Sequence, residues 1–255
     1  MYRVLLALLT AMSTVAYAAD IGISPPRHEL VATAGETVVT TVTVLTTATL
    51  DQQVTGETSD WTMDIAGGTA FLATGSVQHS AAGWIELDAA AFVLPARGSR
   101  DVRLSVTVPP DPGLDGTYHA MVFFTVAPPP SEARGVGVIT TTRVGLTVYV
   151  TVAGTERAGS ELVDLYQTDG RELRAVILNT GNTVMRLSGE IQLRDEAGAV
   201  RHRLEVPDVP VMRESERELT FTLPNEVEAG FYVALALIQD SRGGLLAGEL
   251  PLEVP

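Results

Sequence analysis

Runs of valine and threonine dominate the chain from residue 36 onward, and apolar and polar residues alternate within them. The clearest run is Glu36 to Leu45, whose two-residue period is typical of a strand with one buried face. No segment carries the sustained i, i+3, i+4, i+7 apolar stripe of an amphipathic helix. We therefore predict strands at residues 36–45, 101–108, 117–126, 136–152, 172–178, 187–193, 216–223 and 231–238.

Clusters of Gly, Pro, Asn and Asp separate these segments, as is typical of turns between short strands. Many short strands at this spacing indicate sandwiches or barrels. A stretch of small and polar residues, 154–159, follows the long segment 136–152. We therefore predict one sandwich over residues 19–153, a joint at 154–159 and a second sandwich over residues 160–255. Because the joint is short, we expect the two domains to pack at a defined angle.

The first 18 residues have the pattern of a signal peptide. Arg3 precedes an apolar run from Val4 to Leu9, and Ala16-Tyr17-Ala18 has the small-x-small pattern of a cleavage site. A membrane anchor or a buried helix is the alternative, but the apolar run is short for a span of about 20 residues. We expect residues 1–18 to be removed and the rest to be exported, periplasmic or otherwise in the cell envelope, without membrane insertion.

Composition excludes several kinds of chemistry. The chain has 31 acidic and 17 basic residues, for a formal charge of −14, so its surface should repel nucleic acid. All 17 basic residues are Arg, and the absence of Lys excludes a P-loop and Schiff-base catalysis. The absence of Cys excludes disulfides, thiolate nucleophiles and Cys-based metal sites.

No catalytic motif is complete. His28-Glu29 begins a pattern similar to HExxH, but Ala32 stands where the second His is needed. No Gly-x-Ser-x-Gly elbow occurs, and the four His lie on separate segments. We therefore predict a protein that is not an enzyme and uses no metal and no cofactor, and we keep a hydrolase only as a remote alternative.

Two further groups of residues receive structural interpretations. The four carboxylates Asp60, Asp64, Glu86 and Asp88 could approach one another in a sandwich, but a solvated acidic face is the interpretation we favour. Trp61 and Trp84 are the only tryptophans, and we expect one or both to fill the core of the first sandwich.

Three features of the first domain suggest binding rather than catalysis. Pro25-Pro26-Arg27 opens a strand, and a Pro pair suits a sheet edge because Pro donates no ladder hydrogen bond. We expect Arg27 to point into a cleft, although an ordinary surface arginine is the alternative. The apolar strand 118–126 is followed by a Pro-rich loop at 127–135 and the long strand 136–152, which could accept another strand at its edge. A plain hairpin in a closed sheet is the alternative.

This ensemble resembles the periplasmic pilus chaperones of the PapD type and their wider relatives. The resemblance covers most of the chain and consists of an early Arg, an apolar strand, a Pro-containing loop and a long strand, in that order. It implies an all-β fold of two immunoglobulin-like β-sandwich domains in tandem, arranged as a boomerang. It also implies an exported protein subunit as partner, bound by strand pairing, with no cofactor.

The resemblance implies a set of partner-binding residues. Arg27 matches the family's early Arg, and Val136, Val138 and Thr140 match the alternating residues that the long strand lends to an incomplete subunit. The family's second anchor, a Lys, falls at Gly145, and Arg143 lies two residues earlier on the same face. Arg27 and Arg143 together could bind a chain-terminal carboxylate, because Arg presents a planar fork of donors.

The function predicted from the sequence is an exported, pilus-chaperone-like factor that binds its partner by pairing at strand 136–152. The alternative is a cell-surface structural or adhesive immunoglobulin-like module without chaperone activity. An exposed strand also favours pairing with itself, so we expect possible dimerisation through residues 136–142.

Overall fold

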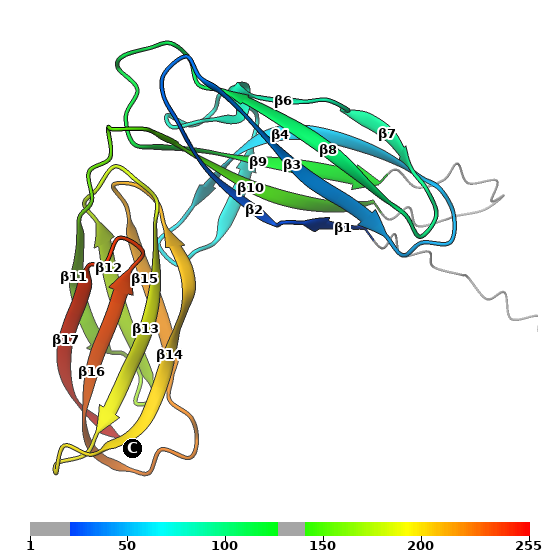
Figure 1. The fold of residues 1–255 in the computed structure, drawn as a ribbon. Helices are drawn as coiled ribbons and strands as arrows, with labels where there is room; N and C mark the ends of the chain where they lie inside the picture. The colour runs from blue at the N-terminus through cyan, green and yellow to red at the C-terminus, as the bar shows by residue number, and fades with distance from the viewer. Residues whose placement is uncertain (1–20, 127–140) are drawn as a thin grey trace, which may run out of the picture.

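The computed structural model describes residues 21–126 and 141–255, and almost every regular element in them is a β-strand. The only helix in this part of the chain is one 3₁₀ turn, and no helix there is long and apolar enough to cross a membrane. The predicted all-β fold class is confirmed. The two groups of strands meet at an elbow (Figure 1).

The first domain contains two sheets that pack face to face. One has the order β1-β3-β8-β6 and the other β2-β10-β9-β4-β5, with β7 paired to β4. Buried Val, Leu and Phe side chains from both sheets form its core, including Val42, Leu104, Phe124 and Leu146. Its elements are β1 (Ile21–Ser24), β2 (Arg27–Ala32), β3 (Thr37–Thr46), β4 (Gln52–Met63), β5 (Thr69–Leu72), η1 (Ala82–Trp84), β6 (Ile85–Leu87), β7 (Ala91–Leu94), β8 (Ser99–Thr107), β9 (Thr117–Val126) and β10 (Thr142–Val152).

The second domain is a smaller sandwich with its own core. Its sheets have the orders β11-β12-β15 and β14-β13-β16-β17, and Ile177, Leu193, Ala236 and Ile238 are fully buried between them. Its strands are β11 (Ser160–Gln167), β12 (Glu172–Asn179), β13 (Met185–Arg194), β14 (Val200–Val211), β15 (Glu216–Thr222), β16 (Gly230–Asp240) and β17 (Leu245–Val254).

The chain changes sheets at the proline pair. β1 pairs antiparallel with β3, whereas β2 pairs parallel with β10 in the opposite sheet. Pro25 and Pro26 lie between these two strands, each of which is an edge of its sheet. This crossing places Arg27, the first residue of β2, directly beside Thr147 of β10.

An apolar cluster closes the seam between the domains. Trp61 of β4 and Tyr149 of β10 pack with Met212, which follows β14 in the second domain. The rings of Trp61 and Tyr149 meet edge to face at 6.3 Å. Trp61 therefore lies outside the first sandwich core, on the opposite face of the sheet, and the prediction that one or both tryptophans fill that core holds for Trp84 alone. Trp84 alone packs against that core, and it is only partly buried.

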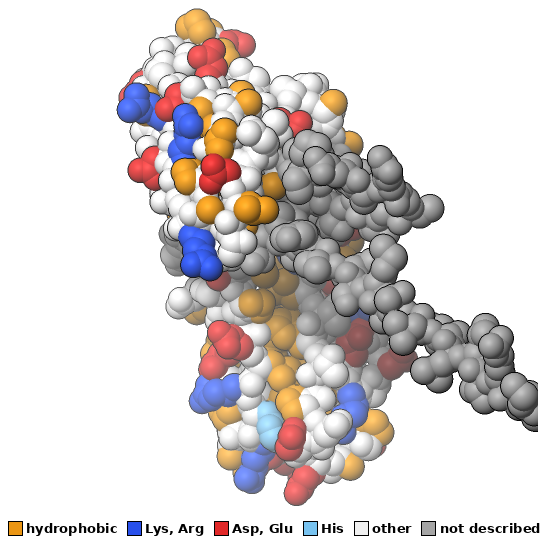
Figure 2. All heavy atoms as spheres, turned by 90° about the vertical axis from the view of Figure 1, so that its right-hand side faces the viewer, with side chains coloured by type: hydrophobic (Ala, Val, Ile, Leu, Met, Phe, Trp, Pro, Cys, Tyr) orange, Lys and Arg blue, Asp and Glu red, His pale blue; other side chains and the backbone are white. Residues whose placement is uncertain are grey.

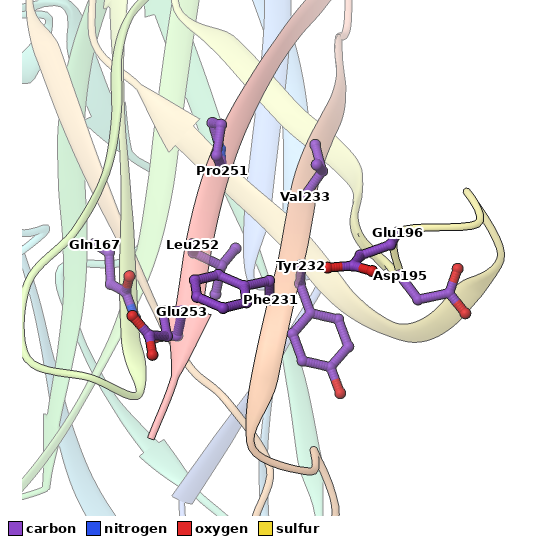
Figure 3. Close-up of a pocket in the computed structure, with 9 residues that line it drawn as sticks. All are labelled: Gln167, Asp195, Glu196, Phe231, Tyr232, Val233, Pro251, Leu252 and Glu253. Carbon is purple, nitrogen blue, oxygen red and sulfur yellow. The ribbon is translucent and has the colours of Figure 1, made fainter.

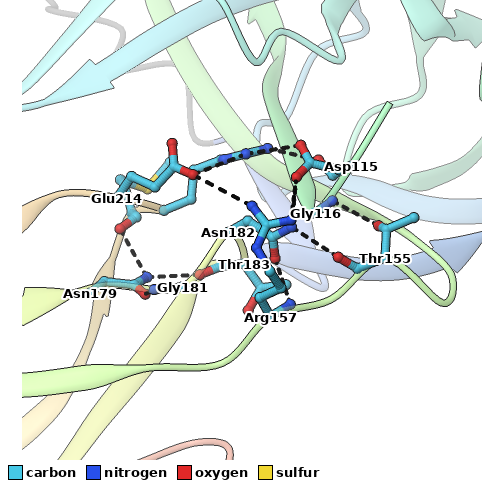
Figure 4. Close-up of polar contacts among 11 residues, drawn as sticks. Asp115, Gly116, Thr155, Arg157, Asn179, Gly181, Asn182, Thr183 and Glu214 are labelled. Carbon is cyan, nitrogen blue, oxygen red and sulfur yellow. Dashed lines mark hydrogen bonds and ion pairs between the residues drawn. The ribbon is translucent and has the colours of Figure 1, made fainter. Parts of the chain in front are cut away.

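A polar network beside this cluster joins the same two domains (Figure 4). Arg213 donates from Nη1 to the carbonyl oxygen of Asp115 at 2.7 Å and from Nη2 to its carboxylate at 3.1 Å. Asn182 donates to the same carboxylate at 2.9 Å. The Arg213 side chain is only 5% exposed and that of Asp115 is 34% exposed, so this ion pair is partly shielded from solvent screening.

The joint between the domains belongs to this network. The backbone N–H of Arg157 donates to Asn182 Oδ1 at 2.7 Å, and the Arg157 side chain lies 3.0 Å from the Asp115 carboxylate. Gly116 has a φ of 64°, and a Cβ there would lie 2.0 Å from the carbonyl oxygen of Asn182. The close approach of the two domains therefore requires glycine at this position.

The hairpin of β4 and β5 makes a third contact across the seam. The backbone N–H of Glu218, on the edge strand β15, donates to the carbonyl oxygen of Ile65 at 2.8 Å. One strand edge of the second domain is thus partly covered by a turn of the first domain. These contacts hold the two sandwiches together at the elbow, where residues 153–159 connect β10 to β11.

Asp60 is not part of a solvated acidic face, contrary to the prediction. It is fully buried, and its carboxylate accepts hydrogen bonds from the Ser80 hydroxyl at 2.5 Å and from the backbone N–H groups of Ser76 and Val77 at 2.6 and 3.0 Å. Asp60 therefore ties the segment between β5 and η1 to β4. Nothing in the alternation of the sequence distinguishes it from the exposed carboxylates.

Asp60→Ala should lower the free energy of unfolding by about 2–4 kcal/mol, because buried donors lose their acceptor. Urea unfolding measured by tryptophan fluorescence checks this value. Asp88→Ala is the control, because Asp88 is exposed and accepts one N–H, from Arg103, and its cost should stay below about 1 kcal/mol. Equal costs for the two variants would contradict the structural role of Asp60.

The seam should weaken in acid. Hydrogen bonds from Asn182, Arg213 and Arg157 lower the pKa of Asp115 from 3.8 to about 2. Because the folded-state pKa lies below the unfolded one, the carboxylate stabilises the folded form above pH 3.8, and this contribution disappears as the pH falls toward 2. The difference in urea midpoint between wild type and Asp115→Asn should therefore shrink between pH 4 and pH 2.

Asp111→Asn is the control for the seam, since Asp111 is exposed in the preceding turn. It should change the midpoint at pH 6 less than Asp115→Asn does. A difference between wild type and Asp115→Asn that stays constant with pH would show that the Asp115 charge does not hold the seam.

Candidate functional site

The outer face of the sheet β2-β10-β9-β4-β5 is turned toward the second domain. Figure 2 looks into the hollow between the domains and shows hydrophobic side chains in the recess beneath the first one. The strand register places Arg27, Thr147, Met121 and Ser59 side by side on this face, one from each of four neighbouring strands. The candidate site is this sheet face.

Arg27 lies where the first domain faces the second. Its Nε lies 2.8 Å from Glu29 Oε1 on the same strand, and its Nη1 lies 3.9 Å from Asp208 Oδ2 in the second domain. The side chain is 38% exposed, so it remains accessible to a further anion. Because exposed ion pairs contribute little, an incoming carboxylate could replace Glu29 at small cost.

The second domain supplies further charges opposite Arg27. Arg186 Nε donates to Asp208 Oδ1 at 2.6 Å, and this hydrogen bond lowers the pKa of Asp208. Tyr149 lies next to these groups, and burial raises the pKa of its hydroxyl to about 12. Tyr149 is therefore neutral across the physiological pH range, and the local field comes from two arginines and two carboxylates.

Arg143 lies on the same sheet face as Arg27, but on the side of β10 that is next to β9. Its Nη2 donates to Glu57 Oε1 of β4 at 2.7 Å, and its guanidinium lies 3.5 Å from the centre of the Phe123 ring. Such a cation–π contact together with an ion pair fixes the orientation of the guanidinium. Arg143 thus lies on top of the β9–β4 part of the sheet.

Gly145 stands where the resemblance places the family's Lys, and two apolar side chains cover it. A Cβ at Gly145 would lie 2.6 Å from Met121 Cε and 2.7 Å from Phe123 Cε1. Phe123 in turn meets Phe71 edge to face at 4.9 Å. A lysine could enter this position only if Met121 and Phe123 moved, so the site carries an apolar floor there instead of a charge.

The structure places Arg27 and Arg143 on one sheet face but does not bring them together. Arg27 pairs with Thr147, which is four residues beyond Arg143 on β10 and therefore about 13 Å away. Each arginine has its own carboxylate partner. The two side chains are separate anchor points along the strand rather than one fork around a single carboxylate.

One edge of β10 is open at its beginning. Residues 142–151 of β10 all pair with β9, but β2 pairs only with residues 147–152. No strand in the described ranges therefore pairs with Thr142–Leu146 on the β2 side. Unpaired main-chain donors and acceptors of this kind can bind an extended segment of another chain.

Three of the predicted partner-binding residues, Val136, Val138 and Thr140, lie outside the described residues. The residues that sequence reasoning missed are those around the two arginines: Glu29, Glu57, Phe123, Tyr149 and Asp208. Glu29 is two residues from Arg27, and that i, i+2 spacing in a strand is a signal that the sequence does contain. The others come from distant segments, and nothing in their local pattern singles them out.

The arrangement has features suited to binding. No group of three or more His, Cys, Asp or Glu side chains in residues 21–126 and 141–255 is arranged to hold a metal ion. The groups that face the hollow are two arginines, carboxylates, a neutral tyrosine, apolar side chains and an open strand edge. Arg is the side chain that best matches a carboxylate, and the open edge matches an extended main chain.

Comparisons with known proteins identify the fold. No protein-family model matches the sequence, and no curated protein matches it. Among solved structures, the YadV chaperone superposes with a TM-score of 0.51 at 11% identity, covering 91% of this chain and 100% of that chain. A chain from a chaperone–tip adhesin complex of CFA/I fimbriae biogenesis gives a TM-score of 0.50 at 13% identity, covering 92% and 99%. The protein therefore has the two-domain, all-β fold of the PapD-type fimbrial chaperones, as the sequence resemblance predicts.

Proposed function

We propose that the protein is an exported, non-enzymatic factor that binds an exported protein subunit by strand pairing along β10. The partner's chain-terminal carboxylate binds Arg27, and Arg143 contacts the partner strand farther along β10. Val136, Val138 and Thr140 provide side chains to the partner beyond the start of β10. The fold shared with the YadV chaperone supports this proposal, and the geometry of β10 and β2 carries it.

The observation that carries the proposal is the direction of β2. β2 runs parallel to β10 and begins at Arg27, beside Thr147. A partner strand that continues this row beside Thr142–Leu146, also parallel to β10, must end at Leu146. Its terminal carboxylate then meets Arg27, the first residue of β2. The position of the unpaired edge, the direction of β2 and the charge of Arg27 are all consistent with this binding mode.

The free energy of such binding has two sources. Main-chain hydrogen bonds along the open edge provide affinity without sequence preference, and alternate side chains provide selectivity. The Arg27–carboxylate contact adds a charge-assisted hydrogen bond of about 1.5–3 kcal/mol. No nucleotide or metal takes part in this mechanism.

Arg27→Ala should strongly reduce recovery of the partner. We would purify tagged wild type and Arg27→Ala from the native cell envelope and identify bound proteins by mass spectrometry. Wild type should carry one small exported subunit in equimolar amount, and Arg27→Ala about tenfold less, since the charged contact is lost. Arg103→Ala is the matched control, because Arg103 is exposed on β8 in the other sheet, and it should retain the partner.

An equally abundant partner in wild type and Arg27→Ala would favour the alternative, a surface module whose contacts lie elsewhere. A wild type without any partner would contradict the proposed binding of exported subunits. Loss of the partner in both arginine variants would mean that the effect is not specific to Arg27.

The open edge should also pair with itself when no partner is present. Size-exclusion chromatography with light scattering should find wild type partly dimeric and Val138→Arg monomeric, because a charge on the pairing strand opposes edge-to-edge association. A monomeric wild type, or a Val138→Arg variant that stays dimeric, would rule out self-association through residues 136–142.

A further inference from the structure

The second domain carries a surface feature far from the hollow between the domains. It lies at the end of the second sandwich where the chain terminates (Figures 1 and 3). The outward positions of β16 are Phe231, Val233, Leu235 and Leu237, whereas the core takes the alternate residues Ala234, Ala236 and Ile238. We call these four outward residues the β16 stripe.

The β16 stripe departs from the usual pattern of a sandwich strand. An outer strand face in contact with water is normally polar, and isolated exposed apolar residues need no explanation. Here four successive outward positions are apolar, and Phe231 at the end of the row is 63% exposed. Val233, Leu235 and Leu237 are only partly exposed, so Phe231 is the fully exposed member of the row. An exposed aromatic ring that continues an apolar row is typical of an interaction surface.

Two neighbouring hollows lie at the exposed end of the stripe. One is lined by Phe231, Val233, Pro251, Glu253 and the Asp195–Glu196 turn, and the other adds Glu226 and Glu228. Figure 3 shows the ring of Phe231 lying between β16 and β17, close to Glu253, which is its register partner. The hollow thus combines one aromatic face with surrounding carboxylates.

The charge around Phe231 is negative on balance. Arg201 and His202 also line one of the hollows, and Arg194, the register partner of Val233, donates to Gln192. Asp195 is paired with Arg201. Four other carboxylates, Glu196, Glu226, Glu228 and Glu253, form no ion pair among the described residues. A second copy of this chain, with its own acidic surface, would be repelled here, because the net charge is −14.

We propose that this end of the second domain is a docking site for an extended, basic segment of a partner protein in which Arg or Lys alternates with apolar residues. The apolar side chains pack along the β16 stripe. A guanidinium or ammonium group lies over the Phe231 ring and is bound by Glu196 and Glu253, as in other cation–π sites flanked by acids. This site is separate from β10 and Arg27 and does not depend on their function.

Fluorescence anisotropy tests the proposal with the full-length protein and a labelled peptide, Gly-Arg-Leu-Arg-Leu-Arg-Gly, whose ends are blocked. Wild type should bind this probe saturably at low ionic strength, and added salt should weaken the binding. Phe231→Ala should weaken binding about fivefold or more through the lost cation–π and apolar contacts. Glu196→Gln/Glu253→Gln should weaken it about tenfold.

A matched control separates this site from the general acidity of the chain. Glu86→Gln/Glu161→Gln removes two exposed carboxylates elsewhere and should change the dissociation constant less than twofold. The same peptide with Glu in place of Arg should not bind. Equal weakening in both double variants, unchanged binding in Phe231→Ala, or no saturable binding by wild type would overturn the proposal. Arg27→Ala should bind the probe like wild type. The outcome of this test is therefore independent of whether Arg27 binds a partner in the hollow between the domains.

Discussion

The partly shielded contact between Arg213 and Asp115 is the interaction on which the rest of the molecule depends. Each sandwich has its own core, and no strand continues from one into the other. The hollow therefore exists only because a few contacts at the seam fix the elbow. Arg213 donates to both the backbone and the carboxylate of Asp115, which specifies a direction as well as a distance. The apolar cluster around Trp61 then excludes water from the neighbouring contacts.

Much of the fold could be predicted from the sequence, because half-buried strands have a two-residue period. β3, β9, β12 and β16 lie within a residue or two of their predicted positions. In two of the strands without a prediction, this period is hidden. β4 is rich in polar residues and contains Gly56. Residues 59–61 at its far end are all buried, so its burial does not alternate along the whole strand. β14 is an edge strand that contains two prolines, and proline is tolerated at an edge.

The site was harder to predict, because its residues come together only through the sheet register. Arg27 could be selected from the Pro pair before it, and it lies where the first domain faces the second. Arg143 lies on the same face but is paired with Glu57 in this structure, so the cooperation of the two arginines stays a prediction. Asp60 and Trp61 show the same limit of prediction from sequence. Their burial depends on tertiary contacts and cannot be predicted from residue type alone.

The parallel pairing of β2 with β10 has a consequence for the length of a strand that could bind beside it. β2 occupies the position beside β10 from Thr147 onward. In the proposed binding mode, a partner strand therefore ends just before Arg27, and this end fixes the register of all its other residues. If the terminal segment of the partner were one residue longer, its strand would have to shift by one residue along β10, away from Arg27. Such a slip turns every side chain to the opposite face of the sheet. In the proposed binding mode, the first residue of β2 would therefore act as an end stop, and partners would be selected by the length of their terminal segment as well as by its composition.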